Sequence, residues 1–204
     1  MRTAQTARTS RETDIFCNLT LEGRGVSKIT TPIGFLSHML EAFSKHGVFD
    51  LNLSVKGDME VDQHHTVEDT GIVLGQTFKK SLGDMKGINR AGSFAFPMDE
   101  SLGIVAVDIA GRSHVTFNVT FSHECIGELN TDLIQEFFEG FATGLGANIA
   151  VYVPYGRDDH HKTEAIFKAF GRSLQEAVDA NPRRKGTVTS TKDIIDFVDH
   201  ESDK

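Results

Sequence analysis

Asp62-Gln63-His64-His65-Thr66-Val67-Glu68 and Asp158-Asp159-His160-His161-Lys162-Thr163-Glu164 both read D-x-H-H-x-x-E. The second segment begins 96 positions after the first, at 158 against 62. A glycine, Gly75 or Gly171, follows each glutamate by seven positions. Adjacent histidines are not needed to fill a protein core, so the duplicated pair indicates an internal repeat that carries a function.

The repeat extends upstream of both histidine motifs. Apolar residues recur at helical spacing in Phe35–Phe43 and in Leu133–Phe141, which predicts an amphipathic helix in each half. Alternating apolar residues predict half-buried strands before the Gly-Arg pairs that end Leu19–Arg24 and Val107–Arg112. Further strands are expected between helix and motif, at Asp50–Val55 and Ile149–Val153.

These elements predict an α+β fold made of two duplicated halves. Each half is expected to contain a mostly antiparallel sheet and two helices, with the helices packed against each other between the sheets. We expect one catalytic domain over residues 1–204, with repeats at roughly 1–92 and 93–192 and the seam near Asn89 to Ser93. An acidic tail follows at residues 193–204.

The composition argues against several functional classes. Hydrophobic residues make up 39% of the 204 residues and charged residues 25%, which is typical of a soluble globular protein. No apolar run is long enough for a membrane span, and Met1 to Thr13 lacks the apolar stretch of a secretory signal. A net charge of −8 argues against nucleic-acid binding, so an anionic substrate would need a locally basic pocket. Two cysteines without paired spacing, Cys17 and Cys125, favour a cytoplasmic location.

The histidine motifs are suited to binding metal ions. Residues four apart lie on one face of a helix, so His64 shares a face with Glu68, and His160 with Glu164. The second histidine of each motif lies about 100° further round the helix and cannot easily serve the same metal. Two metals are therefore predicted, with each motif supplying ligands to both.

Eight residues are candidate metal ligands. Imidazole and carboxylate together suit manganese, iron or zinc better than calcium or magnesium. About four protein ligands per metal would leave open positions for a substrate. The alternative is a solvated histidine-rich face, or histidines satisfied by hydrogen bonds. The candidates are His38, His64, His65, Glu68, Glu136, His160, His161 and Glu164.

Taken together, short motifs along nearly the whole chain resemble the imidazoleglycerol-phosphate dehydratase family. They are Arg11-Glu12-Thr13, Gly34-Phe35-Leu36-Ser37-His38-Met39-Leu40, His46-Gly47, His64-His65-Thr66-Val67-Glu68-Asp69, Met98-Asp99-Glu100, Asp159-His160-His161 with Glu164-Ala165, Phe167-Lys168-Ala169 and Ser190-Thr191-Lys192. The resemblance implies a ribosomal protein S5 domain 2-like fold and two Mn²⁺ ions per subunit. It also implies self-assembly into a 24-mer with octahedral symmetry.

The family resemblance implies a reaction in histidine biosynthesis. Water is eliminated from imidazoleglycerol phosphate to give imidazoleacetol phosphate, through a metal-bound imidazolate and a diazafulvene-like intermediate. Glu12 is expected to contact the substrate and act as the general base, and His46 and Asp99 are expected near the reacting groups. The candidates for binding the phosphate are Arg90, Arg112, Lys168, Ser190 and Lys192. For Arg112, which ends a repeat strand, a structural role is the alternative.

The chain departs from the family pattern at three positions. Glu136 stands where many members have histidine, Ala42 where many have glutamine, and Asp193 where glycine is usual. Glu136 precedes His160 by 24 positions, much as His38 precedes His64 by 26. This spacing favours a ligand role for Glu136, against the alternative of a surface glutamate on an amphipathic helix.

Two other functional classes remain as alternatives. A dinuclear metal-dependent phosphoesterase would use the same metal motifs and release inorganic phosphate. A non-enzymatic metal-binding or scaffold protein is the third interpretation, although the acidic balance and the lack of a basic aromatic surface argue against it.

Overall fold

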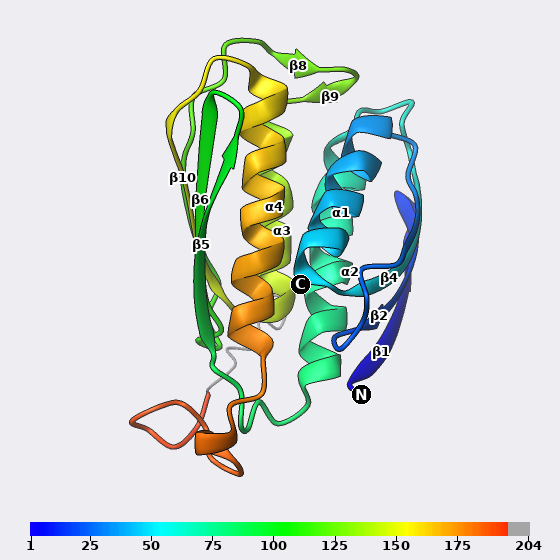
Figure 1. Ribbon diagram of the computed structural model, residues 1–204. Helices are drawn as coiled ribbons and strands as arrows, with labels where there is room; N and C mark the ends of the chain where they lie inside the picture. The colour runs from blue at the N-terminus through cyan, green and yellow to red at the C-terminus, as the bar shows by residue number, and fades with distance from the viewer. Residues whose placement is uncertain (196–204) are drawn as a thin grey trace.

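Two four-stranded sheets form the outer layers of the molecule, and four helices lie between them (Figure 1). The computed structural model describes residues 1–195, so the acidic tail expected at 193–204 lies outside the described residues beyond its first three positions. The layers confirm the predicted α+β fold, with helices packed against helices and the sheets outside.

The first half of the chain forms one sheet and two helices. Its strands lie in the order β1-β2-β4-β3, antiparallel except for the parallel pair β3–β4. The elements are β1 (Thr3–Thr9), β2 (Thr13–Thr20), β3 (Ser27–Thr30), α1 (Gly34–Gly47), β4 (Asp50–Gly57) and α2 (His64–Leu82).

The second half repeats this order of elements. Its sheet has the order β5-β6-β10-β7, with the single parallel pair between β7 and β10. A two-stranded hairpin precedes the third helix, and a short 3₁₀ helix follows the fourth. The elements are β5 (Ala91–Met98), β6 (Ser101–Asp108), β7 (His114–Asn118), β8 (Cys125–Ile126), β9 (Leu129–Asn130), α3 (Leu133–Leu145), β10 (Asn148–Tyr155), α4 (Asp159–Val178) and η1 (Pro182–Arg184).

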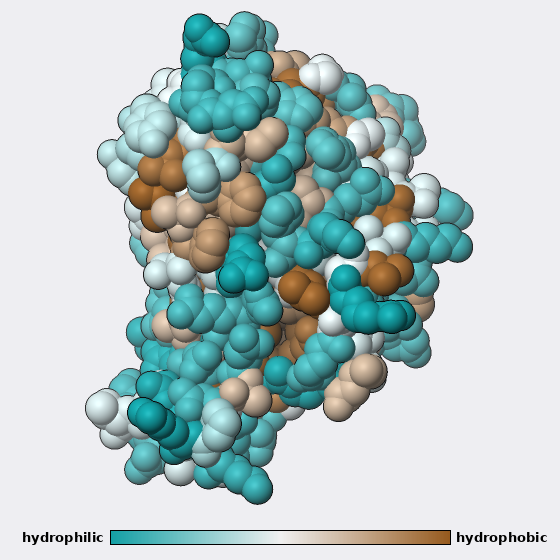
Figure 2. Space-filling view, in the orientation of Figure 1, coloured by the Kyte–Doolittle hydropathy of each residue, from teal (hydrophilic) through white to brown (hydrophobic). Residues whose placement is uncertain are grey.

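Phenylalanines from all four helices meet at the centre of the core. Phe43 of α1 lies 5.0 Å from Phe170 of α4, and Phe78 of α2 lies 5.6 Å from Phe141 of α3, measured between ring centroids. Phe141 and Phe170 join the two pairs at 4.9 Å, and all four rings are fully buried. The outer face in Figure 2 is mostly hydrophilic, with apolar residues in separate small patches. Burial of these rings therefore stabilises the packing of the two halves against each other.

The helices pair across the repeat, α1 with α4 and α2 with α3, at glycine contacts. A Cβ added to Gly171 of α4 would lie 2.5 Å from the Phe43 carbonyl oxygen and 2.9 Å from the Gly47 nitrogen. A Cβ added to Gly75 of α2 would clash in the same way with the backbone of α3, 2.8 Å from the Leu145 nitrogen. Only glycine permits such backbone contact, so these positions set the register of each helix pair.

We expect Gly171→Ala to destabilise the fold. Its methyl group would meet backbone atoms that cannot rotate away, and such overpacking costs about 1–3 kcal/mol. The free energy of unfolding, measured with denaturant, should fall by this amount, whereas Lys80→Ala at an exposed position of α2 should leave it nearly unchanged. An unchanged denaturant midpoint of unfolding for Gly171→Ala would show that α1 and α4 can move apart to accommodate the methyl group without loss of stability.

The β8–β9 hairpin ties together the N-terminal ends of two helices. The Glu128 carboxylate accepts hydrogen bonds from the Gly34 and Phe35 backbone N–H groups at the start of α1. The side chain of Gln63, which precedes α2, donates to the Glu128 carbonyl oxygen and accepts from the Asn130 N–H at 3.2 Å. A carboxylate at a helix N-terminus is favoured by the exposed N–H groups there. The hairpin thereby holds the ends of α1 and α2 that carry histidines.

The segment after α4 returns to the beginning of the second half. Ala180 pairs with Ile88, and the Thr189 side chain donates to the Ile88 carbonyl oxygen. This return brings residues 189–195 beside the start of β5. Within residues 1–195, no helix is long and apolar enough to cross a membrane.

Candidate active site

Three candidate ligands form one cluster between α1 and α4. The Glu164 carboxylate lies 3.2 Å from His160 Nε2 and 3.7 Å from His38 Nε2. One ligand atom from each residue falls within 4.8 Å of the other two. The pair on α4 confirms the predicted one-turn spacing, and the register set at Gly171 brings His38 from the other half. Two imidazoles and a carboxylate converging in this way can hold a divalent transition metal.

Lys168 neutralises part of the charge at this cluster. Its ammonium group lies 2.7 Å from Glu164, one helical turn along α4, and sits 5.3 Å from the centre of the Phe96 ring. Burial raises the pKa of Glu164, but the hydrogen bond and charge of Lys168, together with His38 and His160, outweigh it and hold the pKa below its usual value. Lys168 was predicted to bind the phosphate, whereas in this structure it pairs with a candidate metal ligand.

The motif of the first half, at residues 62–68, provides a less compact set of candidate ligands. His64 Nε2 lies 3.9 Å from the Glu68 carboxylate, as one-turn spacing requires. The contacts at Gly75 put Glu136 of α3 opposite Glu68, as the contacts at Gly171 put His38 opposite Glu164. Glu136 does not join a cluster of the His38 kind within residues 1–195.

The second histidine of each motif points away from the first and toward other carboxylates. The rings of His64 and His65 are 6.2 Å apart and nearly perpendicular, as are those of His160 and His161 at 6.1 Å. The Nδ1 atom of His65 lies 3.1 Å from Asp58, and its pKa is raised mainly by that hydrogen bond.

His161 has an equivalent partner that the sequence did not reveal. Its Nδ1 atom lies 2.8 Å from the Glu100 carboxylate, and this hydrogen bond raises the pKa of His161. Backbone N–H donors, first that of Asp158, and the histidine lower the pKa of Glu100 strongly. Asp99, the predicted catalytic residue, is largely exposed at 74% and lies 3.8 Å from His161 Nε2. The motif Met98-Asp99-Glu100 contains both acids, but no local signal distinguishes their roles.

The predicted base, Glu12, lies at the tip of the β1–β2 hairpin. Its carboxylate is half exposed and lies 3.8 Å from His65 Nε2. Asp69 anchors the hairpin to α2, because its carboxylate accepts from Thr13 Oγ1 at 2.6 Å and pairs with Arg8. Asp69 directly follows the candidate metal ligand Glu68, so one turn of helix carries that residue and the anchor of the candidate base.

His46 lies away from the His38 cluster, two turns further along α1. At 1.5 Å per residue this corresponds to about 12 Å. Its ring packs edge-on against Phe96, with centroids 4.9 Å apart. Burial, followed by the charges of Lys168 and Arg172, lowers the pKa of His46. The position suits a neutral packing residue near Lys168 better than a group in contact with the clustered ligands.

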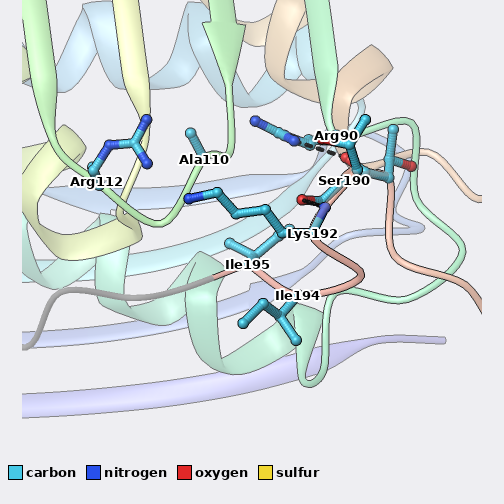
Figure 3. Close-up of a pocket in the computed structure, with 9 residues that line it drawn as sticks. Arg90, Ala110, Arg112, Ser190, Lys192, Ile194 and Ile195 are labelled. Atoms are coloured by element: carbon cyan, nitrogen blue, oxygen red, sulfur yellow. Dashed lines mark hydrogen bonds between the residues drawn. The ribbon is translucent and has the colours of Figure 1, made fainter.

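A basic pocket of about 510 Å³ lies between the start of the second sheet and the returning C-terminal segment. Figure 3 shows the side chains of Arg90, Arg112 and Lys192 arranged around it, with Ala110 between the two arginines. Arg90 donates to both oxygens of Asp108, at 2.7 and 3.0 Å, and to the Thr189 carbonyl oxygen at 2.7 Å. The pocket therefore unites four of the five predicted phosphate-binding residues, Arg90, Arg112, Ser190 and Lys192.

We expect Arg112→Ala and Lys192→Ala to raise KM for a phosphorylated substrate. Loss of one charge-assisted hydrogen bond costs about 1.5–3 kcal/mol, or roughly 10- to 150-fold in binding. Lys185→Ala, an exposed lysine that does not line the pocket, is the control and should bind substrate normally. Normal KM values in both pocket variants would place the phosphate elsewhere.

Comparison with known proteins decides the family. The family model described as "Imidazoleglycerol-phosphate dehydratase" matches residues 31–174, which include both histidine motifs. The imidazoleglycerol-phosphate dehydratase of Methylorubrum populi is 48% identical over 192 residues, covering 94% of this chain and 98% of the relative. This chain belongs to the imidazoleglycerol-phosphate dehydratase family. As a member of that family the protein is a hydro-lyase.

Solved structures of imidazoleglycerol-phosphate dehydratases have the same fold. The enzyme from Staphylococcus aureus superposes with a TM-score of 0.79 at 37% identity, over 88% of this chain and 99% of that one. The IGPD of Pyrococcus furiosus gives a TM-score of 0.81 at 32% identity, over 93% and 99%. The likeness therefore extends over both halves of the repeat.

Proposed function

We propose that the protein eliminates water from imidazoleglycerol phosphate to give imidazoleacetol phosphate, a step of histidine biosynthesis. The observation that carries this function is the His38–His160–Glu164 cluster on a chain of the dehydratase family. The basic pocket between Arg112 and Lys192 supports it, because it supplies the local positive charge that a phosphate needs on a protein of net charge −8.

The resident metal in this proposal is Mn²⁺, two ions per subunit. The donor set at His38, His160 and Glu164 fits such an ion, since imidazole and carboxylate ligands suit manganese, iron and zinc. His64, Glu68 and Glu136 would hold the second ion through their shared register on α2 and α3. When bound, the ions act as Lewis acids that favour loss of a proton from the substrate imidazole.

Self-assembly into a 24-mer with octahedral symmetry completes the proposal. His65 and His161 face away from the first histidines of their motifs, and their Nε2 atoms lie 3.8 Å from Glu12 and Asp99. Neither histidine belongs to the His38 cluster. A neighbouring copy that docks against this end of the helices would receive them as additional ligands. We place the assembly in the cytoplasm, with no nucleic-acid or membrane partner, in line with the acidic charge.

The chain's own residues divide the remaining work of the reaction. Glu12, on an anchored but solvent-accessible hairpin tip, takes the proton from the carbon next to the one that loses hydroxide. Arg112, Ser190 and Lys192 hold the phosphate. Arg90 of this pocket donates its backbone N–H to the carbonyl oxygen of Ala177, 17 residues along α4 from His160 or about 25 Å away, so the pocket that serves this cluster belongs to a neighbouring copy in the assembly. The anchor at Asp69 keeps Glu12 beside His65 while the substrate binds.

The product of the reaction tests this function. Purified protein loaded with Mn²⁺ is incubated with imidazoleglycerol phosphate, and the products are identified by NMR and by a phosphate assay. A keto phosphate without release of inorganic phosphate is the expected result. Inorganic phosphate as the main product would instead establish the phosphoesterase alternative.

We expect Glu136→Ala to weaken one metal site, whereas Glu136→His retains two metals and substantial turnover. By the register at Gly75, position 136 is the repeat mate of position 38, whose histidine is a candidate ligand. Glu139→Ala, on an exposed part of the same helix, is the control. Metal content by elemental analysis and kcat are the measurements. Two metals and parental turnover in Glu136→Ala would exclude Glu136 as a ligand.

A further inference from the structure

Glu12 and Glu100 occupy equivalent places in the two halves of the repeat. Each is the last residue before the second strand of its half, since β2 begins at Thr13 and β6 at Ser101. Each lies at the tip of a hairpin and faces the second histidine of a motif, Glu12 toward His65 and Glu100 toward His161. Their surroundings nevertheless differ.

The Glu100 carboxylate is held by four donors. Its Oε1 atom accepts from the Asp158 N–H at 2.8 Å and from the Arg157 N–H and the Ser101 hydroxyl, each at 3.1 Å. Its Oε2 atom lies 2.8 Å from His161 Nδ1. One carboxylate thus joins the β5–β6 hairpin, the start of α4 and the ring of a histidine. A group held on both oxygens is suited to fix its neighbours in place.

Asp58, and not Glu12, makes the matching contact in the first half. The Asp58 oxygens lie 3.1 and 3.3 Å from His65 Nδ1, while Glu12 lies 3.8 Å from the other ring nitrogen, Nε2. Glu12 is half exposed, whereas the side chain of Asp58 is 14% exposed. In the first half, the carboxylate that holds the His65 ring, Asp58, is therefore separate from the one near the Nε2 atom, Glu12.

We propose that Glu100 and Asp58 are positioning residues that orient the second histidines, His161 and His65. Of the two equivalent glutamates, Glu12 and Glu100, only Glu12 is then available for proton transfer. A neutral imidazole has one N–H, and a carboxylate at Nδ1 holds that hydrogen there and directs the unprotonated Nε2 outward. Nε2 is then the atom offered to a divalent metal, in the arrangement of a carboxylate–histidine–metal triad. This inference rests on the proposed metal-dependent function and assigns the residues that prepare its ligands.

The test compares Glu100→Gln with its repeat mate Glu12→Gln in the full-length protein. Loss of such an orienting carboxylate typically costs 10- to 100-fold in metal affinity. Mn²⁺ is titrated into the metal-stripped protein, and free Mn²⁺ is measured by EPR. We expect Glu100→Gln to bind Mn²⁺ about 10- to 100-fold more weakly and to regain most of its kcat at high Mn²⁺. Glu12→Gln should bind Mn²⁺ like the parent and regain none.

Several outcomes would overturn the assignment. Parental Mn²⁺ affinity in a Glu100→Gln variant that circular dichroism shows to be folded would mean that Glu100 does not orient His161 for metal binding. A kcat deficit in that variant that persists at saturating Mn²⁺ would give Glu100 a direct part in proton transfer. Should Glu100→Gln fail to fold, Asp58→Asn decides, since weaker Mn²⁺ binding supports the proposal and parental binding refutes it. A further result to distinguish is a parent protein that forms no keto phosphate, while Glu100→Gln still binds Mn²⁺ more weakly than the parent does. That result would disprove the proposed function and leave the positioning role of Glu100 intact.

Discussion

Metal-stripped protein is expected to show no measurable dehydration of imidazoleglycerol phosphate, and added Mn²⁺ is expected to restore it. The reason is that the described cluster brings together two imidazoles and a carboxylate and leaves coordination positions for a substrate. The measurement is the initial rate of keto phosphate formation after dialysis against a chelator, with metal content checked by elemental analysis.

Single substitutions locate this dependence in the cluster. His160→Ala should lose both a metal and nearly all turnover, whereas His114→Ala, an exposed histidine on β7, should behave like the parent. Full activity in protein shown to be metal-free would end the metal hypothesis. Loss of activity in the His114 variant as well would point to a general effect on the fold.

The Glu12→Gln substitution should lower kcat by about 10²–10⁴-fold, the usual contribution of a positioned general base. Glutamine keeps the size and hydrogen-bonding capacity of the side chain but cannot accept the proton. KM should change little, because the phosphate pocket lies on another part of the chain. Steady-state kinetics at saturating Mn²⁺ provide the measurement.

The exposed Glu60, between β4 and α2, is a matched control for this substitution. Glu60→Gln has the same change of charge and should keep the parental kcat. An unchanged kcat in Glu12→Gln would remove Glu12 from the mechanism. A large rise in KM without a change in kcat would make Glu12 a substrate-binding residue and not the base.

Local periodicity predicted the four helices, the strands β2, β4, β6 and β10, and half of each candidate metal site, but not the other strands or the β8–β9 hairpin. The one-turn spacing from His160 to Glu164 appears as a 3.2 Å contact, and that from His64 to Glu68 as 3.9 Å. The duplicated order of strands and helices likewise follows from repeated apolar patterns. These properties depend on neighbours within a few residues, so a single sequence contains them.

The division of candidate ligands between the two candidate sites required the tertiary structure. His38 joins the motif of the other half, at Glu164, and not the motif of its own half at His64. The choice depends on the pairing of α1 with α4, which backbone contacts at Gly47 and Gly171 set. Those glycines are more than a hundred positions apart, and no periodic pattern connects them.

The partners of the ionisable groups depended in the same way on contacts between distant segments. The Lys168–Glu164 ion pair is an exception, because the two residues lie one turn apart on α4 and helical spacing alone brings them together. Glu100 and Asp58 hold the second histidines because hairpin tips and loops converge at the ends of the helices. The residue types and their helical faces are encoded locally, whereas a contact such as that of Glu100 with His161, 61 positions apart, arises only when segments far apart in the chain pack together.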